Sequence, residues 1–301
     1  MSGLSYIKKL SWACLCIAGV ACTKSSTGPN GNVSVQARKY AVHFNIGDVD
    51  ASDTRMAAKE MPIRNYLWYL YYAAYDSNGY QVSKIIQDSL NRDYMGPEFG
   101  VVKDSLAPGN YTVVVVGERY NQIKIKNDSL LSTLNLAGNQ DYQDYVFLKK
   151  GPIHVGNADT TIKAIKLEPI TGQLEVLMTD SNRTEMPEGT ISIDSVPSKY
   201  VALTATTSLF GTNSFTSYFN LYSSWTVDYG ILGSNASHTV TITLHDSNGN
   251  TTLERTIKDV YVYPGRKTIL RGKLFGSQGG RSARLPDRTV NSANGDIIQD
   301  F

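Results

Sequence analysis

The sequence has little of the material from which active sites and covalent frameworks are built. It holds three cysteines and four histidines in 301 residues, which leaves few candidates for disulfides, thiol catalysis or structural zinc. It lacks a His-Glu-x-x-His motif, a nucleophile elbow, a phosphate-binding loop and a Gly-x-Gly-x-x-Gly turn. We therefore predict a protein that is not an enzyme and that binds no metal or cofactor. A hydrolase without a recognisable motif is a weaker alternative. Its catalytic pair of carboxylates would be defined by their separation in space, which the sequence does not show.

The charge shows no excess of either sign. Lys and Arg number 29 and Asp and Glu 27, and Lys8 and Lys9 lie in a segment that we expect to be removed. A neutral surface argues against electrostatic binding of nucleic acid. Hydrophobic residues make up 41% of the chain, enough for one large or two medium folded domains.

A hydrophobic run long enough to span a bilayer is also missing from the amino terminus. The apolar stretch 10–21 follows two lysines and falls short of the roughly 20 residues that a membrane helix needs. Residues 1–21 have the layout of a signal peptide. Cys22 follows Ala18-Gly19-Val20-Ala21, which resembles the lipobox of bacterial lipoproteins, so we predict that Cys22 carries lipid. The alternative is an ordinary secretory signal in which Cys22 is incidental.

Residues 22–32 and the absence of further thiols fit this prediction. Cys14 and Cys16 lie in the signal segment, so cleavage before Cys22 leaves no free thiol. Residues 22–32 are rich in Ser, Thr, Gly and Asn, the composition of a flexible tether.

The rest of the chain is predicted to be all-β. Residues 33–46 suggest a first strand with a bulge near Arg38, and 63–75 form an aromatic strand that enters the hairpin turn Asp76-Ser77-Asn78-Gly79. The continuous apolar run 112–116 predicts a sheet covered on both faces. For residues 121–150 we expect a loop or one short helix, with strand character returning at 145–148.

Two short sequence motifs recur in the same order in the two halves of the chain. Asp246-Ser247-Asn248-Gly249 repeats the first turn, and Pro264-Gly265 followed by a Thr-containing strand repeats Pro108-Gly109. This favours a duplicated β-sandwich. We place domains at 33–168 and 169–276, with the boundary where Pro169 and Gly172 interrupt the strand pattern. The polar tail 277–301 is expected to be mobile, or to pair through its apolar end with an open sheet edge.

Two groups of residues are candidate sites. Tyr218, Tyr222 and Trp225 could form an aromatic platform for a glycan, although aromatic residues at strand spacing are more often part of a core. Five Asp-Ser/Thr triplets resemble the O-glycosylation sequon of exported Bacteroidetes proteins, while Asp-Ser is also an ordinary turn pair. The acceptor residues would be Ser89, Ser105, Ser129, Thr160 and Ser195.

Taken together, these motifs resemble the fimbrillin and Mfa2/FimB-like lipoproteins of Bacteroidetes. The residues that carry the likeness are Cys22 with its tether, the aromatic strand 67–79, the Leu-x-Pro-Gly-x-Tyr-Thr-Val segment 106–113, and Tyr-Pro-Gly-Arg-Lys-Thr-Ile-Leu-Arg-Gly-Lys-Leu-Phe at 263–275. The resemblance implies two transthyretin-like Greek-key β-sandwiches and a role as a fimbrial anchor, accessory or structural subunit.

The resemblance also implies a location and partners. We expect lipid attachment to the outer membrane, on the cell surface, and contact with other fimbrial subunits by strand addition to an open sheet edge. Cleavage after Arg38, Arg55 or Arg64 would mark a stalk subunit, whereas an anchor would keep Cys22 and its first strand. The alternative function is a surface glycan-binding lipoprotein that uses exposed aromatic residues and contacts a host or glycan ligand.

Overall fold

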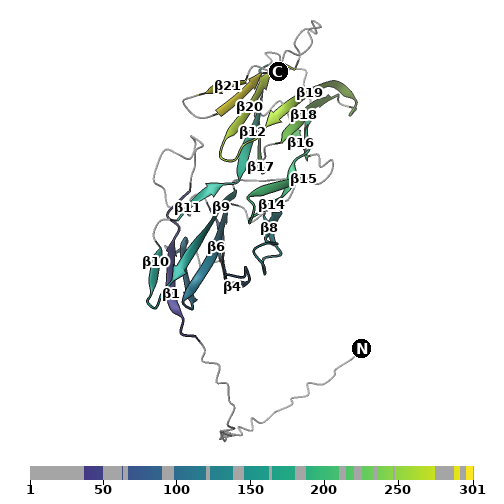
Figure 1. Ribbon diagram of the computed structural model, residues 1–301. Helices are drawn as coiled ribbons and strands as arrows, with labels where there is room; N and C mark the ends of the chain where they lie inside the picture. Colours follow the sequence, from purple (N-terminus) through teal and green to yellow (C-terminus); the bar gives the residue numbers. More distant parts are fainter. Residues whose placement is uncertain are drawn as a thin grey trace, which may run out of the picture. The chain divides into compact units, whose positions relative to one another are not determined.

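The computed structural model of the chain consists of β-strands joined by turns and loops (Figure 1). It describes residues 37–49, 63, 67–89, 98–119, 123–137, 146–162, 165–179, 188–209, 215–219, 226–232, 236–246, 248–274, 288–291 and 296–300. These ranges contain no α-helix, and no helix within them could cross a membrane. The all-β prediction is confirmed.

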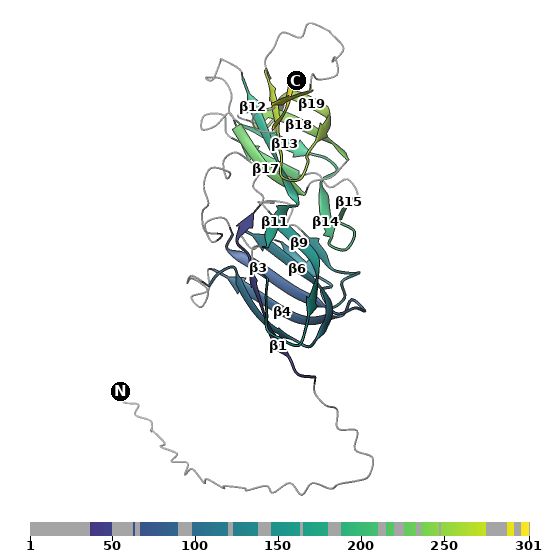
Figure 2. The same ribbon diagram turned by 60° about the vertical axis from the view of Figure 1, so that its left-hand side comes forward.

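The first half is built on two facing sheets (Figure 2). A three-stranded sheet has the order β10-β1-β5, where β1 is Tyr40–Asn45, β5 Val101–Leu106 and β10 Thr160–Ile162. A six-stranded sheet has the order β2-β11-β9-β6-β3-β4, with β2 Asp48–Val49, β3 Tyr69–Tyr75, β4 Gln81–Asp88, β6 Gly109–Glu118, β9 Val146–Val155 and β11 Lys166–Pro169. Burying the apolar side chains of both sheets, such as Val42, Phe44 and Tyr72, forms one core.

The outer face of the six-stranded sheet is also covered, as the apolar run 112–116 predicts. A four-stranded sheet of order β15-β14-β8-β7 supplies part of the cover, with β7 Lys124–Lys126, β8 Asn135–Ala137, β14 Pro197–Val201 and β15 Thr206–Leu209. A second core contains Tyr71, Val114, Leu136 and Tyr200. Within the described residues, the expectation of a loop or short helix at 121–150 misses the strands β7 and β8, which pair with each other. The strand character predicted for residues 145–148 is confirmed, because β9 begins at Val146.

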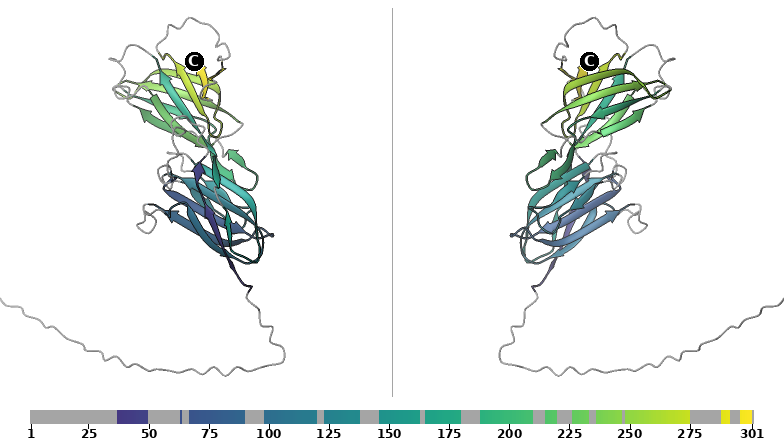
Figure 3. Two further views of the ribbon diagram at one scale, coloured as in Figure 1. Left: turned by 90° about the vertical axis from the view of Figure 1, so that its left-hand side faces the viewer. Right: turned by 90° about the vertical axis from the view of Figure 1, so that its right-hand side faces the viewer.

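The later strands form two further sheets, drawn green to yellow in Figure 3. One has the order β17-β12-β20-β22-β21, with β12 Thr171–Met178, β17 Thr226–Leu232, β20 Lys267–Gly272, β21 Arg288–Asn291 and β22 Asp296–Asp300. The other has the order β16-β13-β18-β19, with β13 Glu188–Ile193, β16 Phe215–Phe219, β18 Ser237–His245 and β19 Thr251–Tyr261. A third core spans residues 174–274 and includes Leu174, Ile191 and Leu270.

The two repeated turns have the same geometry. Asp76 Oδ1 accepts hydrogen bonds from the backbone N–H groups of Asn78 and Tyr80, both 2.9 Å, and Asp246 Oδ1 does the same two and four residues further on at 2.9 and 2.8 Å. Gly79 has φ 83° and Gly249 φ 82°, a conformation in which glycine avoids the Cβ clash. The local turn prediction is confirmed at both positions.

The two halves repeat one sandwich topology, as the inference of duplication predicts. The order β10-β1-β5 corresponds to β20-β12-β17, and β9-β6-β3-β4 corresponds to β19-β18-β13-β16, with the same parallel and antiparallel pairings. The two turn motifs that suggested the repeat, however, do not occupy equivalent places in it. After Pro108, β6 returns to the sheet that contains the first hairpin and pairs with β3. After Pro264, β20 leaves the sheet of its hairpin and pairs with β12 in the other sheet. A short turn motif reflects the backbone conformation that the turn itself requires. The same motif can therefore occur in turns whose flanking strands have different neighbours.

The predicted interruption of the strand pattern between Pro169 and Gly172 is short in the structure. Pro169 is the last residue of β11, Gly172 lies inside β12, and Ile170 alone separates the two strands. The tail contains β21 and β22 in its described part, and Ile297 and Ile298 pair with Thr268 and Ile269. The prediction that the apolar end pairs with a sheet edge is confirmed, and mobility of these strands is wrong.

The domain bounds 33–168 and 169–276 stay a prediction. Strands β14 and β15 follow the proposed boundary, yet β14 pairs with β8, which precedes it.

Candidate assembly surfaces and side-chain networks

The first strand is held on both sides. β1 pairs antiparallel with β5 over six residues, from Tyr40 opposite Leu106 to Asn45 opposite Val101. Its other edge pairs parallel with β10 from Val42 to Phe44. Val42 and Phe44 are fully buried, so β1 belongs to the core as well as to the sheet.

In contrast to β1, strand β4 has a neighbouring strand on one side only. It is the last strand of the six-stranded sheet and, among the described strands, pairs with β3 alone. Val82 and Ile86 on this strand, and Tyr80 just before it, are 46%, 40% and 61% exposed. An edge strand with exposed apolar side chains is a surface to which another extended chain can add.

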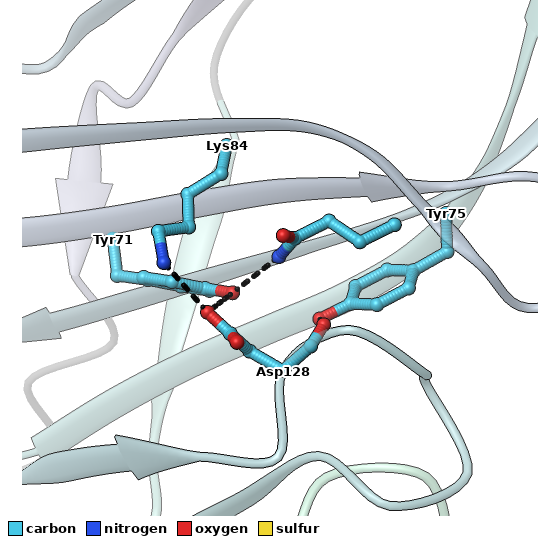
Figure 4. A network of polar contacts seen from close by, with 5 residues as sticks. Tyr71, Tyr75, Lys84 and Asp128 are labelled. Atoms are coloured by element: carbon cyan, nitrogen blue, oxygen red, sulfur yellow. Dashed lines mark hydrogen bonds and ion pairs between the residues drawn. The ribbon is translucent and has the colours of Figure 1, made fainter.

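A tyrosine network fixes this edge strand to the segment after β7 (Figure 4). Asp128 Oδ2 accepts a hydrogen bond from the Tyr71 hydroxyl at 3.3 Å and an ion-paired hydrogen bond from Lys84 Nζ at 2.9 Å. Gln81 Nε2 donates to the Tyr71 hydroxyl oxygen at 3.1 Å, and the Tyr75 hydroxyl donates to the backbone oxygen of Asp128 at 2.9 Å. The buried tyrosines therefore keep polar partners, which burial requires.

The electrostatics of the network follow from its contacts. Burial raises the pKa of the Tyr71 hydroxyl well above its usual range, and the nearby Asp128 carboxylate adds to the shift. Partial burial by itself would raise the pKa of Asp128, but the hydrogen bond and charge of Lys84 outweigh it and hold that pKa below its ordinary value. At neutral pH the network consists of a neutral phenol, a carboxylate and an ammonium group.

A second set of side chains joins β4 to β5, the edge strands of the two facing sheets. Gln87 is 3% exposed; its Nε2 donates to Val101 O at 2.8 Å and its Oε1 accepts from the Gly100 N–H at 2.9 Å. Asp104 accepts from the Tyr72 hydroxyl at 3.0 Å and from Ser83 Oγ at 2.9 Å. These side-chain bonds close this side of the sandwich without a backbone ladder.

The predicted lipid site and most of the predicted aromatic platform lie outside the described residues. Cys22, Tyr222 and Trp225 lie outside the described residues, as do Arg55 and Arg64. Tyr218 is in β16, opposite Thr190 of β13. The lipid site and the aromatic platform therefore stay predictions.

The predicted O-glycosylation residues differ in accessibility. Ser105 and Ser129 are exposed, whereas Ser89, Thr160 and Ser195 are half-buried. The preceding aspartates already have structural roles: Asp104 and Asp128 bind tyrosines, and Asp159 Oδ1 accepts the Ala41 N–H at 2.9 Å. These roles cannot be predicted from the sequence, because the partners lie far away along the chain.

In the described part of the chain, the histidines and acidic residues do not form a metal site. Within it, no group of three or more His, Cys, Asp or Glu residues is placed to hold a metal ion. His154 is exposed and 2.8 Å from Asn110 Oδ1, and His238 is buried with Nδ1 3.3 Å from Asp194 O. Burial lowers the pKa of His238, which keeps its ring neutral.

Comparison with known proteins identifies relatives of the whole arrangement. Residues 70–277 match the family described as fimbrillin-A associated anchor proteins Mfa1 and Mfa2. A search of curated proteins finds no match.

Solved structures share the fold at low sequence identity. A candidate polysaccharide-binding protein from Bacteroides thetaiotaomicron has a TM-score of 0.52 and 12% identity, with 71% of this chain and 79% of that chain covered. A candidate adhesin from Bacteroides ovatus has a TM-score of 0.50 and 12% identity, with 75% and 84% covered. The fimbrial anchor protein Mfa2 from Porphyromonas gingivalis has a TM-score of 0.45 and 15% identity, with 72% and 82% covered.

Proposed function

The chain belongs to the family of fimbrillin-A associated anchor proteins, and from this membership we propose that it is a lipid-anchored outer-membrane subunit that attaches a fimbria to the cell. In this proposal Cys22 carries the lipid and residues 22–32 are the tether. The protein acts without catalysis, and it contacts neighbouring fimbrial subunits by strand addition.

The position of β1 is the observation that supports an anchor over a stalk subunit. β1 is bonded on both sides and carries Val42 and Phe44 into the core. Its sandwich is therefore complete without a strand from another subunit. Such a subunit suits the end of a fimbria, where the chain keeps its first strand and the lipid that precedes it.

The edge strand β4 supports strand addition as the mode of contact. The Gln81 N–H at its start donates to Ser129 O at 3.0 Å, and beyond this residue its outer edge has no backbone partner among the described strands. Val82 and Ile86 are exposed on this part of the strand. Backbone hydrogen bonds would supply affinity there, and the apolar side chains would fix the register.

The test is the intact mass and the amino-terminal residue of the protein recovered from native membranes, beside a Cys22→Ala control. We expect a complete mature chain that starts at an acylated Cys22, and a control that loses both the acyl mass and membrane attachment. A chain that starts after Arg55 or Arg64 has lost β1 and would instead identify a stalk subunit. A start after Arg38 would remove the lipid but leave β1 in the sandwich. An unlipidated chain with another start would overturn the lipoprotein assignment.

The same spectra test the glycosylation proposal. Ser105 and Ser129 are the accessible acceptors, so added hexose mass should disappear in the Ser105→Ala and Ser129→Ala double variant. A native protein that carries no such mass is unmodified at all five triplets.

A further inference from the structure

The four-stranded sheet β15-β14-β8-β7 has a one-sided charge in a chain that is otherwise balanced. The whole sequence has 29 basic and 27 acidic residues. The four strands contain Lys124, Lys126 and Lys199 and no Asp or Glu. The charge of this small sheet is therefore entirely positive.

Strand register places these lysines on one face. Lys124 and Lys199 both lie opposite Ala137, and Lys126 lies in the next row, opposite Asn135. The residues between them, Ile125, Leu136 and Tyr200, are also in register and pack in the core on the other face. Directly opposed residues share a face of a sheet, so the lysines point away from that core.

The spacing follows from sheet geometry. Lys124 and Lys126 are two residues apart on one strand, about 7 Å, and Lys124 and Lys199 are two strands apart, about 10 Å. Three cations thus lie within a small area. We call this surface, made of Lys124, Lys126, Lys199, Thr206 and Ser208, the lysine face.

The described residues do not neutralise the lysines of this face. Lys84, Lys103 and Lys149 elsewhere form ion pairs with carboxylates, whereas none of the three lysines of the lysine face pairs with a described residue. Asp128, the acidic residue nearest along the chain to Lys124 and Lys126, is already bonded to Lys84 and Tyr71. Grouped, unpaired cations raise the local potential and attract anions.

Hydroxyl groups lie next to the cations. Ser208 is opposite Lys199 and Thr206 is opposite Val201 in the neighbouring row. The Ser208 Oγ is buried and has no hydrogen-bond partner in the described part of the chain. A buried atom is closed to a ligand, so the exposed hydroxyl of Thr206 is the one that this face offers.

We propose that the lysine face binds an extended anionic polysaccharide that carries carboxylate or sulfate groups. The ammonium groups, about 7 and 10 Å apart, would contact successive charges of the polymer, and the exposed Thr206 hydroxyl would hydrogen-bond to a sugar hydroxyl. A bilayer fits less well, because the rows of this face carry no aromatic residue and only Val201 as a larger apolar one, whereas interfacial binding needs buried apolar area. The lysine face contains no residue of β1 or β4, so the inference does not depend on the proposed function.

The experiment measures binding of the full-length protein in detergent to polygalacturonate and dextran sulfate, with neutral dextran as the reference polymer. The variant Lys124→Gln/Lys126→Gln/Lys199→Gln is compared with Lys39→Gln/Lys103→Gln/Lys258→Gln, which removes the same charge from exposed positions elsewhere. We expect the dissociation constant to rise at least tenfold in the first variant and to stay within twofold in the second. Raising the salt concentration should weaken binding.

Several outcomes would overturn the proposal. Absence of binding to either acidic polymer, equal binding to neutral dextran, or equal losses in the two triple variants would each do so. Vesicles of one part phosphatidylglycerol and three parts phosphatidylcholine provide a further arm. If they bind through the same lysines more tightly than the polymers do, the face is a membrane contact. Thermal unfolding followed by circular dichroism establishes that both variants are folded.

Discussion

At the scale of single residues, Asp128 shows how one carboxylate can stabilise several distant segments. It receives the hydroxyl of Tyr71 and the ammonium group of Lys84, and its backbone oxygen receives the Tyr75 hydroxyl. Tyr71 and Tyr75 are at most 1% exposed, so their hydroxyls depend on these protein partners more than on water.

A double-mutant cycle tests this network. Asp128→Ala should lower the free energy of unfolding by about 1–3 kcal/mol, because a buried hydroxyl loses its acceptor. Tyr71→Phe removes the same bond from the other side, so the double variant should lose about 1 kcal/mol less than the two single losses added together. Urea unfolding measures all three. Lys103→Met, which removes an exposed pair, should leave stability unchanged. Strict additivity would show that Tyr71 and Asp128 are not coupled.

His238 predicts a dependence of stability on pH. Burial lowers its pKa in the folded state, so the unfolded chain takes up a proton first as the pH falls. The stabilising contribution of the neutral ring is complete above the unfolded pKa of about 6.5 and is lost as the pH falls toward the folded pKa.

The measurement is urea unfolding at several pH values between about 7.5 and 5. The wild-type protein should lose stability across this range, and His238→Phe should lose less. His154→Gln, which changes an exposed histidine, serves as the matched control and should follow the wild type. Identical slopes for wild type and His238→Phe would contradict the expectation.

At the scale of elements, features encoded by neighbouring residues are the ones that the sequence predicts. The two Asp-Ser-Asn-Gly turns form because the aspartate side chain bonds the backbone ahead and the glycine adopts a positive φ. The apolar run of β6 likewise predicts burial on both faces, and Val114 and Val115 are fully buried against different cores.

Elements that are stabilised by partners far away along the chain are not predicted from the sequence. β7 and β8 have three residues each, too few for a periodic signal. They exist because Ile125 and Leu136 pack on Tyr71 and Val116 of the six-stranded sheet. The placement of β20 beside β12 is set in the same way, by tertiary packing.

Gly172 gives a prediction for β12. A Cβ atom there would lie 2.7 Å from Val262 Cγ1 and closer still to the backbone oxygen of Tyr263. Because a backbone atom cannot rotate away, Gly172→Ala should destabilise the protein by about 3 kcal/mol, at the upper end of overpacking effects. Gly151→Ala is the control, since a Cβ at Gly151 meets nothing within 4 Å. Equal midpoints of urea unfolding for the two variants would refute this explanation.

The carboxy-terminal strands give a second prediction at this scale. The core around Leu174 and Leu270 contains none of the described side chains of β22, Ile297 to Asp300, while β22 covers one edge of β20 and Asp300 pairs with Arg271. Deleting residues 288–301 should therefore leave the protein folded but expose that edge, which favours association. Light scattering during gel filtration should show concentration-dependent oligomers. A monomer at all concentrations, or a chain without a cooperative unfolding transition, would contradict this.

At the scale of the whole molecule, the sequence indicates family and fold more directly than function. The lipobox and turn motifs give the family resemblance, and the family match over residues 70–277 confirms it. The lysine face and the edge of β4 are not visible in the sequence, because both depend on which strands become neighbours. The lipid on Cys22 stays a prediction that mass spectrometry decides.

Removal of β1 tests whether the molecule is complete in itself. Cleavage after Arg38 leaves Tyr40–Asn45 in place, so thermal stability should be unchanged. Deletion through Asn45 removes Val42 and Phe44 from the core and should cost about 3 kcal/mol or more, since each lost side chain leaves a cavity. Calorimetry of the two truncated proteins measures the difference. Equal stability would mean that β1 is dispensable and that the anchor assignment loses its support.

The pairing of β1 also determines how the protein would respond to tension. Its hydrogen bonds to β5 and β10 run across the strand, and the predicted lipid precedes it at Cys22. A pull along β1 from that end would load these bonds together, in shear, instead of opening them one after another. The same strand that completes the sandwich would thus give a tethered subunit its resistance to mechanical force.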